Sequence, residues 1–318
     1  TPKYCLLSRP NADEFIVAIT ISDEQQINSL ISQLRNELER PFYLDGIDLS
    51  LQIYYGIANS LEHGNDGEKL IRRASMAAAN AVKSNNTLQF YQNGDDEAYL
   101  YKLNLIEELK LALEQDSGNL FLTYQPKLNL KTKQVDKAEA LIRWIDRNNQ
   151  FVNPEMFIAP AEQSGLIDTL TQWVIRQAVH QIQIWNQQGL YFNVSVNLSA
   201  QDIQHEQFVH FLLETTTHYC VDPSSIILEL TERDIAENEA LVIAKLTHLK
   251  SLGFEISVDD YGIGQSSLAK LKNLPVDELK IDKCFILKRN ESSQDQDIVE
   301  STITLGHKLG LRVVAEGV

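Results

Sequence analysis

The chain has 318 residues, of which 43% are hydrophobic and 23% are charged, so it is long enough for two folded domains and too apolar for intrinsic disorder. Its 28 basic and 44 acidic residues give a formal net charge of -16. This charge argues against binding to duplex DNA or RNA, because such binding neutralises many phosphates with Lys and Arg.

The first part of the chain, residues 1–93, alternates short strand-like and helix-like stretches. Two apolar runs around a polar turn in residues 6–19 predict a β-hairpin. Apolar residues at every third or fourth position of residues 22–42 predict an amphipathic helix. Residues 47–58 alternate as one strand, and residues 67–84 predict a second helix.

Residues 94–116 predict a linker and a connecting helix, and the acidic run from Asp95 to Glu97 is typical of a solvated segment. Over residues 117–318 short apolar strands alternate with long amphipathic helices. Repeated strand-then-helix units predict an α/β fold with a parallel sheet, and this number of units predicts a (β/α) barrel. The expected strands are residues 120–126, 136–144, 191–199, 225–232, 254–262, 278–282 and 311–318.

Carboxylates or amides end most of these strands. A buried strand gains nothing in packing from an unpaired acid, because removing a carboxylate from water costs free energy. In a (β/α) barrel the carboxyl ends of the strands meet at one mouth, where the active sites of this fold lie. An all-oxygen set suits Mg²⁺ or Mn²⁺, and a pair of such cations is a recurrent device for phosphodiester hydrolysis. The residues are Glu139, Asn197, Glu229, Asp259, Asp260, Asp282 and Glu316.

The Asp pair and the strand that ends in Asp282 allow more specific predictions. The adjacent Asp259 and Asp260 could supply one carboxylate that bridges two cations and another that binds a single cation. Lys280 lies two residues before Asp282, so both side chains point to the same side of the strand, and the lysine could orient a water or a phosphate. For any position taken singly, capping of the following helix explains an Asp or Asn equally well.

The motifs of the second part resemble, in order, those of the EAL domains, which are bacterial phosphodiesterases that act on cyclic di-GMP. The naming motif corresponds to residues 139–141 and is followed by Arg143. The resemblance runs from about Tyr99 to the last residue. It implies a modified (β/α)8 TIM barrel whose first two strands are antiparallel. The other matching segments are YQP (124–126), FIAPAEQSGLI (157–167), VSVNLSA (194–200), LELTE (228–232), residues 259–282 and VVAEGV (313–318).

The resemblance also implies roles for single residues. Asp259 would bridge two metals, Lys280 would position the hydrolytic water, and Glu232 would anchor the loop after the two aspartates. Arg143 would meet a phosphate of the dinucleotide. The implied residues are, for catalysis, Lys280, Glu139, Glu232 and Glu316; for the two Mg²⁺ or Mn²⁺ ions, Glu139, Asn197, Glu229, Asp259, Asp260 and Glu316; and for the substrate, Gln125, Leu141, Arg143 and Asp282.

The implied reaction is the metal-dependent opening of one phosphodiester bond of cyclic di-GMP, which gives linear pGpG. The loop after the two aspartates departs from active members, because Ile263 and Gln265 stand in place of Thr and Tyr. In the family this loop often joins a dimer interface, so a homodimer is expected. The last barrel strand of the family lies beyond Val318, and we therefore expect a fragment of a longer protein.

The first part resembles the later part of a GGDEF domain. Residues 11–15, NADEF, stand at the naming turn, and residues 55–58 and 70–83 match later elements. Asn and Ala replace the two glycines that let the backbone approach a nucleotide phosphate, so diguanylate cyclase activity is not expected. Asp13 and Glu14 leave GTP binding open as a regulatory input, and a purely structural role stays equally open.

Three functions remain in competition. A working phosphodiesterase is favoured because every metal ligand that can be aligned is present. A receptor that binds cyclic di-GMP without cleaving it is supported only by the altered loop at Ile263 and Gln265. A scaffold without a nucleotide site leaves the acids at the strand ends unexplained.

The sequence also bears on location. No run of about 18 to 20 apolar residues predicts a membrane-spanning helix, and no secretory leader opens the chain. Cys5, Cys220 and Cys284 match no metal-binding or redox spacing, which is typical of reduced thiols in the cytosol. We expect a cytoplasmic protein, with a membrane anchor upstream in the parent chain left open. Trp173 and Trp185 are expected to pack in the core from a helix.

Overall fold

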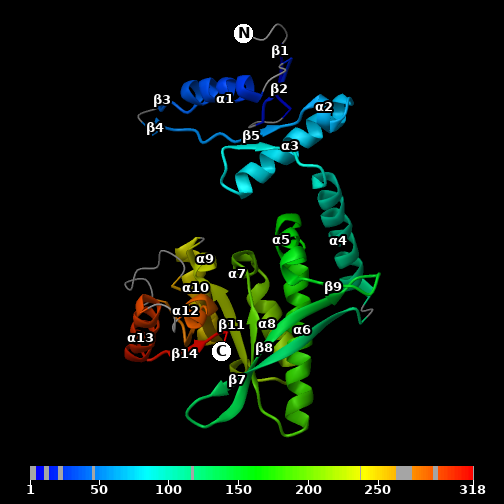
Figure 1. The fold of residues 1–318 in the computed structure, drawn as a ribbon. Coiled ribbons are helices and arrows are strands. Elements are labelled where there is room, and N and C mark those ends of the chain that lie inside the picture. The colour runs from blue at the N-terminus through cyan, green and yellow to red at the C-terminus, as the bar shows by residue number, and fades with distance from the viewer. Residues whose placement is uncertain are drawn as a thin grey trace. The chain divides into compact units, whose positions relative to one another are not determined.

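The structure is a computed structural model, and the chain forms two compact units, residues 1–103 and residues 104–318 (Figure 1). The residues of the expected GGDEF turn from Asn11 to Asp13 lie outside the described part, as do Ile263, Gln265 and Val318. The described residues are 5–10, 14–20, 24–44, 47–115, 118–236, 238–262, 274–288 and 293–317.

The described part of the first unit contains paired short strands and helices. β1 (Cys5–Ser8) and β2 (Ile16–Ile19) are antiparallel, which confirms the predicted hairpin. The prediction of a single strand over residues 47–58 is wrong, because its two halves pair with different partners: β4 lies antiparallel to β3, and β5 lies parallel to β6. The remaining elements are α1 (Glu24–Leu38), β3 (Phe42–Leu44), β4 (Ile47–Leu49), β5 (Tyr55–Ile57), α2 (Ser60–His63), α3 (Gly67–Lys83) and β6 (Leu88–Phe90).

The backbone of α3 lies directly against β5, and a glycine makes this approach possible. A Cβ atom at Gly56 would lie 2.1 Å from the carbonyl oxygen of Ala74 and 2.1 Å from the backbone nitrogen of Ala78. No side chain fits between backbones at that distance. Gly56 therefore sets how closely the helix packs on the strand.

The prediction that Asp95 to Glu97 form a solvated linker is wrong. These residues form the first turn of α4 (Asp95–Gln115), where acidic side chains are favoured by the helix dipole. Asp96 is 9% exposed. Its carboxylate accepts hydrogen bonds of 2.7 Å from Nε of Arg73 and 3.2 Å from Arg72, both on α3. The run thus ties the start of α4 to α3.

The second unit is built around one curled sheet. Its strand order is β14-β13-β12-β11-β10-β8-β7, with β9 paired to β8. β7 and β8 are antiparallel, as expected for the first two strands, and each later neighbouring pair is parallel, the arrangement of a partial (β/α) barrel. The strands are β7 (Leu120–Asn129), β8 (Gln134–Ile145), β9 (Phe151–Val152), β10 (Asn193–Asn197), β11 (Ile226–Thr231), β12 (Glu255–Tyr261), β13 (Glu278–Ile281) and β14 (Arg312–Ala315).

Helices cover the outer face of this sheet (Figure 1). On β11, Leu228 and Leu230 pack in one core cluster with residues of α6, α8 and α10, whereas Glu229 between them faces the other side. Trp173 of α6 is buried in a second cluster, as predicted. The elements are α5 (Pro154–Ser164), α6 (Ile167–Gln187), α7 (Ala200–Gln204), α8 (Phe208–His218), η1 (Pro223–Ser225), α9 (Glu232–Ala236), α10 (Glu239–Ser251), α12 (Lys283–Lys288) and α13 (Ser293–Lys308).

Of the helices in the described ranges, none combines the length with the apolar character that crossing a bilayer requires.

Candidate active site

The inner face of the sheet brings together the polar residues expected at the strand ends. Glu229 lies on β11, one of the central parallel strands, and is 0% exposed. It is paired with Asn197 of β10. Glu139 of β8 accepts a hydrogen bond of 3.0 Å from the side-chain amide of Asn197. Three residues from three neighbouring strands therefore meet at one place.

Lys280 lies at the centre of this group. Its side chain is 1% exposed, and its Nζ atom contacts four carboxylates. Burial disfavours the ammonium, but the nearby carboxylates outweigh burial and raise the pKa of Lys280 above its ordinary value. One buried cation thus holds four acids, at 2.7 Å from Asp259, 2.7 Å from Glu316, 3.0 Å from Glu229 and 3.3 Å from Glu139.

Asp259 and Asp260 both reach the site because the strand is irregular there. In a regular strand successive side chains point to opposite faces. The pairing of β12 with β13 shifts register between Val258 and Tyr261, and Asp260 has a φ of 53°, in the left-handed region that Asp tolerates better than most residues. Such bulges occur next to active sites, where they redirect side chains. The irregularity turns two consecutive carboxylates to one side.

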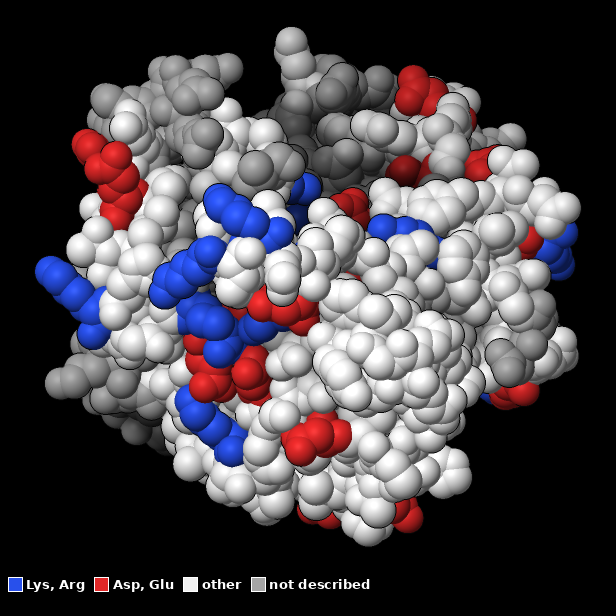
Figure 2. All heavy atoms as spheres, turned by 90° about the horizontal axis from the view of Figure 1, so that it is seen from below, with Lys and Arg blue, Asp and Glu red and all other residues white. Residues whose placement is uncertain are grey.

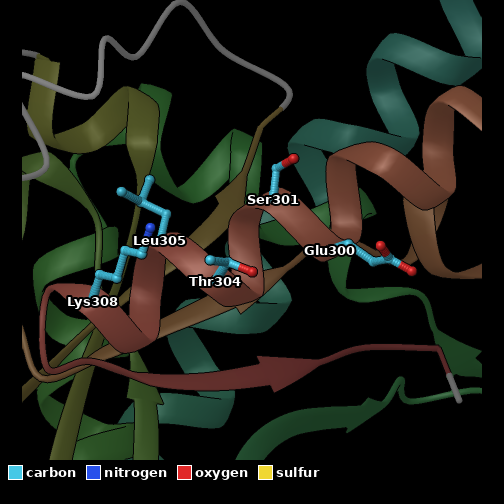
Figure 3. A pocket seen from close by; sticks show the side chains of 5 residues that line it. All are labelled: Glu300, Ser301, Thr304, Leu305 and Lys308. Carbon is cyan, nitrogen blue, oxygen red and sulfur yellow. The ribbon is translucent and has the colours of Figure 1, made fainter.

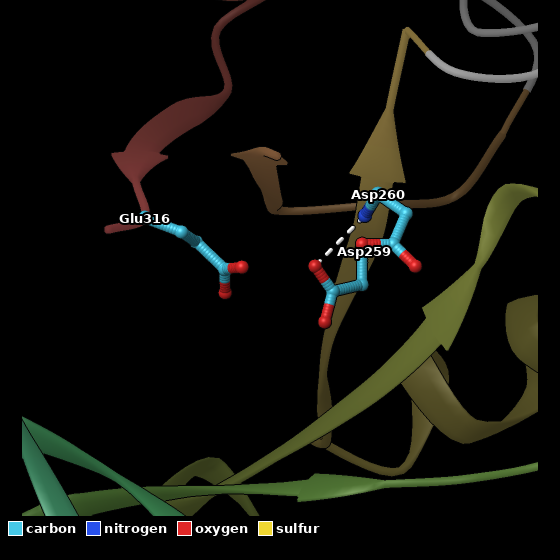
Figure 4. A group of neighbouring side chains, drawn as sticks. All are labelled: Asp259, Asp260 and Glu316. Atoms are coloured by element: carbon cyan, nitrogen blue, oxygen red, sulfur yellow. Dashed lines mark hydrogen bonds between the residues drawn. The ribbon is translucent and has the colours of Figure 1, made fainter. Parts of the chain in front are cut away.

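Three of these acids form a candidate cation site. Asp259, Asp260 and Glu316 each offer one carboxylate oxygen, and these oxygens lie within 4.8 Å of one another (Figure 4). Burial first, and then the neighbouring Asp259 and Asp282, raise the pKa of Asp260 to about 6. Burial also raises the pKa of Glu316, against the effect of Lys280. Carboxylates gathered this closely are a donor set that a divalent cation suits.

Asp282 and Glu232 lie at the edges of the site. Asp282 accepts a hydrogen bond of 2.6 Å from the backbone N–H of Cys284 in the first turn of α12, as a helix-capping Asp does. The capping alternative therefore describes Asp282, which also contacts Asp260. Glu232 opens α9, and its Oε2 atom is buried without a hydrogen-bond partner among the described residues.

Three of the four residues expected to bind substrate, Gln125, Leu141 and Arg143, lie on the β7–β8 pair, whereas the fourth, Asp282, follows β13. Glu139, Leu141 and Arg143 alternate along β8, so their side chains lie on the same face. Gln125 stands directly opposite Glu139 on β7 and is exposed. Arg143 donates a hydrogen bond to the carbonyl of Ile142. Leu141 and Arg143 therefore lie next to Glu139 on this face, in order along β8.

Sequence reasoning missed a second, partly buried lysine next to the site, Lys127. Nζ of Lys127 lies 2.6 Å from Oε1 of Glu229, 2.7 Å from Oγ of Ser195 and 3.5 Å from Oε1 of Glu278. The signal was present, because Lys127 follows Gln125 by two residues on β7 and so points to the same face.

Two hollows of the described surface lie away from the acid cluster. One of about 390 Å³ runs along α13 and is lined by Glu300, Ser301, Thr304, Leu305 and Lys308 (Figure 3). Another, of about 260 Å³, lies between β7 and α6. Neither includes a residue of the acid cluster, so the strand ends remain the candidate site.

Comparison with known proteins supports a family for each unit. The family model described as the EAL domain matches residues 106–318, and that described as the diguanylate cyclase GGDEF domain matches residues 2–87. The chain is 33% identical over its whole length to the signaling protein YkoW of Bacillus subtilis and 32% identical over 98% of its length to the cyclic di-GMP phosphodiesterase PdeR of Escherichia coli. It spans 40% and 47% of the length of these two proteins.

A solved structure has the same fold as the second unit. The structure named PaMucR phosphodiesterase, c-di-GMP complex, is 37% identical in sequence and superposes with a TM-score of 0.64. The match covers 68% of this chain and 87% of that one.

Proposed function

Since this chain belongs to the EAL domain family, we propose that the protein hydrolyses cyclic di-GMP to linear pGpG with divalent cations bound at the acid cluster. Two lines support the proposal: the relatives named as cyclic di-GMP phosphodiesterases, and the solved relative in complex with cyclic di-GMP. The observation that carries it is the set of four carboxylates gathered around Lys280.

The proposed metals are Mg²⁺ or Mn²⁺, two per site. All their proposed ligands carry oxygen donors, as these hard cations prefer. When bound, the cations would lower the pKa of a water and offset the negative charge that develops on the phosphate. The proposed ligands are Glu139, Asn197, Glu229, Asp259, Asp260 and Glu316.

The protein's own residues would hold the reacting groups in place. The proposed role of Lys280 is to orient the attacking water, because its ammonium lies among the proposed metal ligands, 2.7 Å from Asp259 and 2.7 Å from Glu316. Gln125, Leu141 and Arg143 would bind the dinucleotide along β7 and β8, with the guanidinium at a phosphate. Glu232 would anchor the loop that follows the two aspartates.

Finer statements about the whole protein are also proposals. Boundaries at residues 93 and 116 would separate a GGDEF-like domain, a connecting helix and the EAL domain. GTP binding would involve Asp13 and Glu14; one oxygen of Glu14 accepts a hydrogen bond of 2.6 Å from the hydroxyl of Ser75 on α3. Cyclase activity is not part of the proposal. We further propose a homodimer in the cytoplasm.

The test is turnover by the purified parent protein. Cyclic di-GMP is incubated with Mg²⁺ or Mn²⁺, and the products are resolved by chromatography. We expect conversion to pGpG, and its loss in Glu139→Ala, because that variant removes a carboxylate that contacts both Lys280 and Asn197. Tight binding without turnover would favour a receptor instead. No binding at all would leave only a scaffold.

A further inference from the structure

We propose that Lys127 is a positioning residue that fixes Glu229 for metal binding. The inference rests on the proposed function, because it assigns Glu229 to a metal. Glu229 is 0% exposed, so it needs partners for both carboxylate oxygens. Its Oε2 atom lies 3.0 Å from Lys280 and its Oε1 atom lies 2.6 Å from Lys127.

The two lysines contact different oxygens of this carboxylate and differ in their other partners. Lys280 shares its charge with three more acids that are proposed metal ligands. Lys127 instead contacts Ser195 at 2.7 Å and Glu278 at 3.5 Å. The oxygen that faces Lys280 therefore points toward the cation site, and the other is held by Lys127.

The contacts of Lys127 are themselves fixed. Ser195 is 0% exposed, Glu278 is 1% exposed, and the side chain of Lys127 is 12% exposed. Glu278 also contacts Lys137 at 3.0 Å and Arg312 at 3.3 Å. Burial would raise the pKa of Glu278, but Lys127, Lys137 and Arg312 together outweigh burial and lower it. A continuous series of ion pairs thus runs from Arg312 to Glu229.

Such a partner sets the orientation of a metal ligand. Groups that hydrogen-bond a ligating side chain typically change metal affinity by about 10- to 100-fold when they are removed. Without Lys127, one oxygen of Glu229 would be buried without a partner. The carboxylate would then turn to find another partner, and this change weakens a metal bound to its other oxygen.

The test measures Mn²⁺ alone. The metal-depleted parent protein is titrated with Mn²⁺ by calorimetry, and bound Mn²⁺ is followed by electron paramagnetic resonance. We expect Lys127→Met to raise the Kd of one Mn²⁺ by at least tenfold. Lys137→Met is the matched control, because Lys137 is similarly buried and also contacts Glu278 but not Glu229; its Kd should change less than twofold.

A second variant separates the role of Glu229 from the loss of a charge. Lys127→Met also removes a cation from Glu278, and Lys127→Met combined with Glu278→Gln restores the charge balance there. If Lys127 acts on Glu229, the double variant keeps the weak Mn²⁺ binding. The double variant also allows the test if the single variant fails to fold. Recovery of wild-type affinity in the double variant would overturn the proposal.

A kinetic measurement gives an independent criterion. The Mn²⁺ concentration for half-maximal hydrolysis should rise in Lys127→Met, while kcat at saturating Mn²⁺ stays within threefold of wild type. Unchanged or tighter Mn²⁺ binding in this variant would refute the role of Lys127 alone. Wild-type protein that binds Mn²⁺ without hydrolysis would refute the proposed function, and Lys127 would still be judged by affinity. Wild-type protein that binds no Mn²⁺ would refute both.

Discussion

Among single residues, Asp202 shows how burial can shift the pKa of an acid. Asp202 caps α7 together with Ser199 and is 2% exposed. It accepts hydrogen bonds from the backbone and hydroxyl of Ser199 and from the hydroxyl of Thr171. Burial outweighs these bonds and raises the pKa of Asp202 to about 6. Between about pH 4 and pH 6, the folded protein therefore keeps a proton on Asp202 that the unfolded chain has released.

This shift predicts a pH dependence of stability. A raised carboxyl pKa contributes stability that is complete below about pH 4 and is lost as the pH rises through about 6. Across this window the free energy of unfolding should fall by about 3 kcal/mol from this group. Asp202→Asn cannot ionise and should remove that slope, which urea unfolding at a series of pH values would detect.

Asp222 is the matched control, because its environment has the opposite effect. It caps η1 at the surface, and hydrogen bonds from the side chain and backbone of Ser224 lower its pKa. Its stabilising contribution is present above about pH 4 and is lost as the pH falls. Asp222→Asn should therefore leave the slope between pH 4 and pH 6 unchanged. Equal slopes in the wild type and Asp202→Asn would contradict the assignment.

At the scale of elements, Gly56 fixes the distance between α3 and β5. Gly56→Ala would place a Cβ atom 2.1 Å from backbone atoms of α3, so the helix has to move. We expect a loss of about 1 to 3 kcal/mol or more in the first unit. Gly67→Ala is the control, since open space surrounds Gly67 at the start of the same helix and alanine favours helix. Hydrogen exchange of α3 amides measures both; equal exchange in the two variants would contradict the packing argument.

The sequence predicted elements best where periodicity and burial agree. Most strands of the second unit, the hairpin of β1 and β2, and Trp173 in the core follow from local pattern. Residues 47–58 alternate like one strand, yet their halves pair with different strands, which no local pattern records. Asp96 was misjudged because its partners lie on α3, more than twenty residues earlier.

For the site, too, local sequence pattern predicted well, and contacts between distant strands could not be predicted. The acids follow apolar runs in the sequence, so their meeting could be expected from the strand order, although Glu139 and Glu229 lie within β8 and β11 and not at the ends of these strands. The contacts of Lys127 could not, because they depend on the registers of β7, β10 and β11 at once. Roles of single residues therefore remain predictions, whereas their meeting around Lys280 is a feature of the structure.

At the scale of the whole molecule, the face that Figure 2 shows carries one cluster of basic side chains, with acidic side chains directly beside it. The net charge of -16 likewise argues against a broad surface that binds the phosphates of a nucleic acid. Local fields at the strand ends, and not the overall charge, are then expected to govern binding of a charged dinucleotide.

The division into two units leads to a prediction about metal. All proposed ligands lie in the unit of residues 104–318. Mn²⁺ at 100 times its Kd should stabilise that unit by about 2.7 kcal/mol and leave residues 1–103 unchanged. Hydrogen exchange with and without Mn²⁺ separates the two. Equal protection of both units would mean that they unfold together, and protection of neither would remove the metal site.

The irregular backbone at Asp260 limits how this chemistry could be transferred. An engineer who copied the dipeptide Asp259-Asp260 onto a straight strand of another barrel would send one carboxylate inward and the other into the surrounding helices. The register shift and the left-handed residue would have to be grafted with it. The two aspartates act together only with this backbone conformation. The dipeptide sequence alone is therefore weak evidence for such a site in another protein.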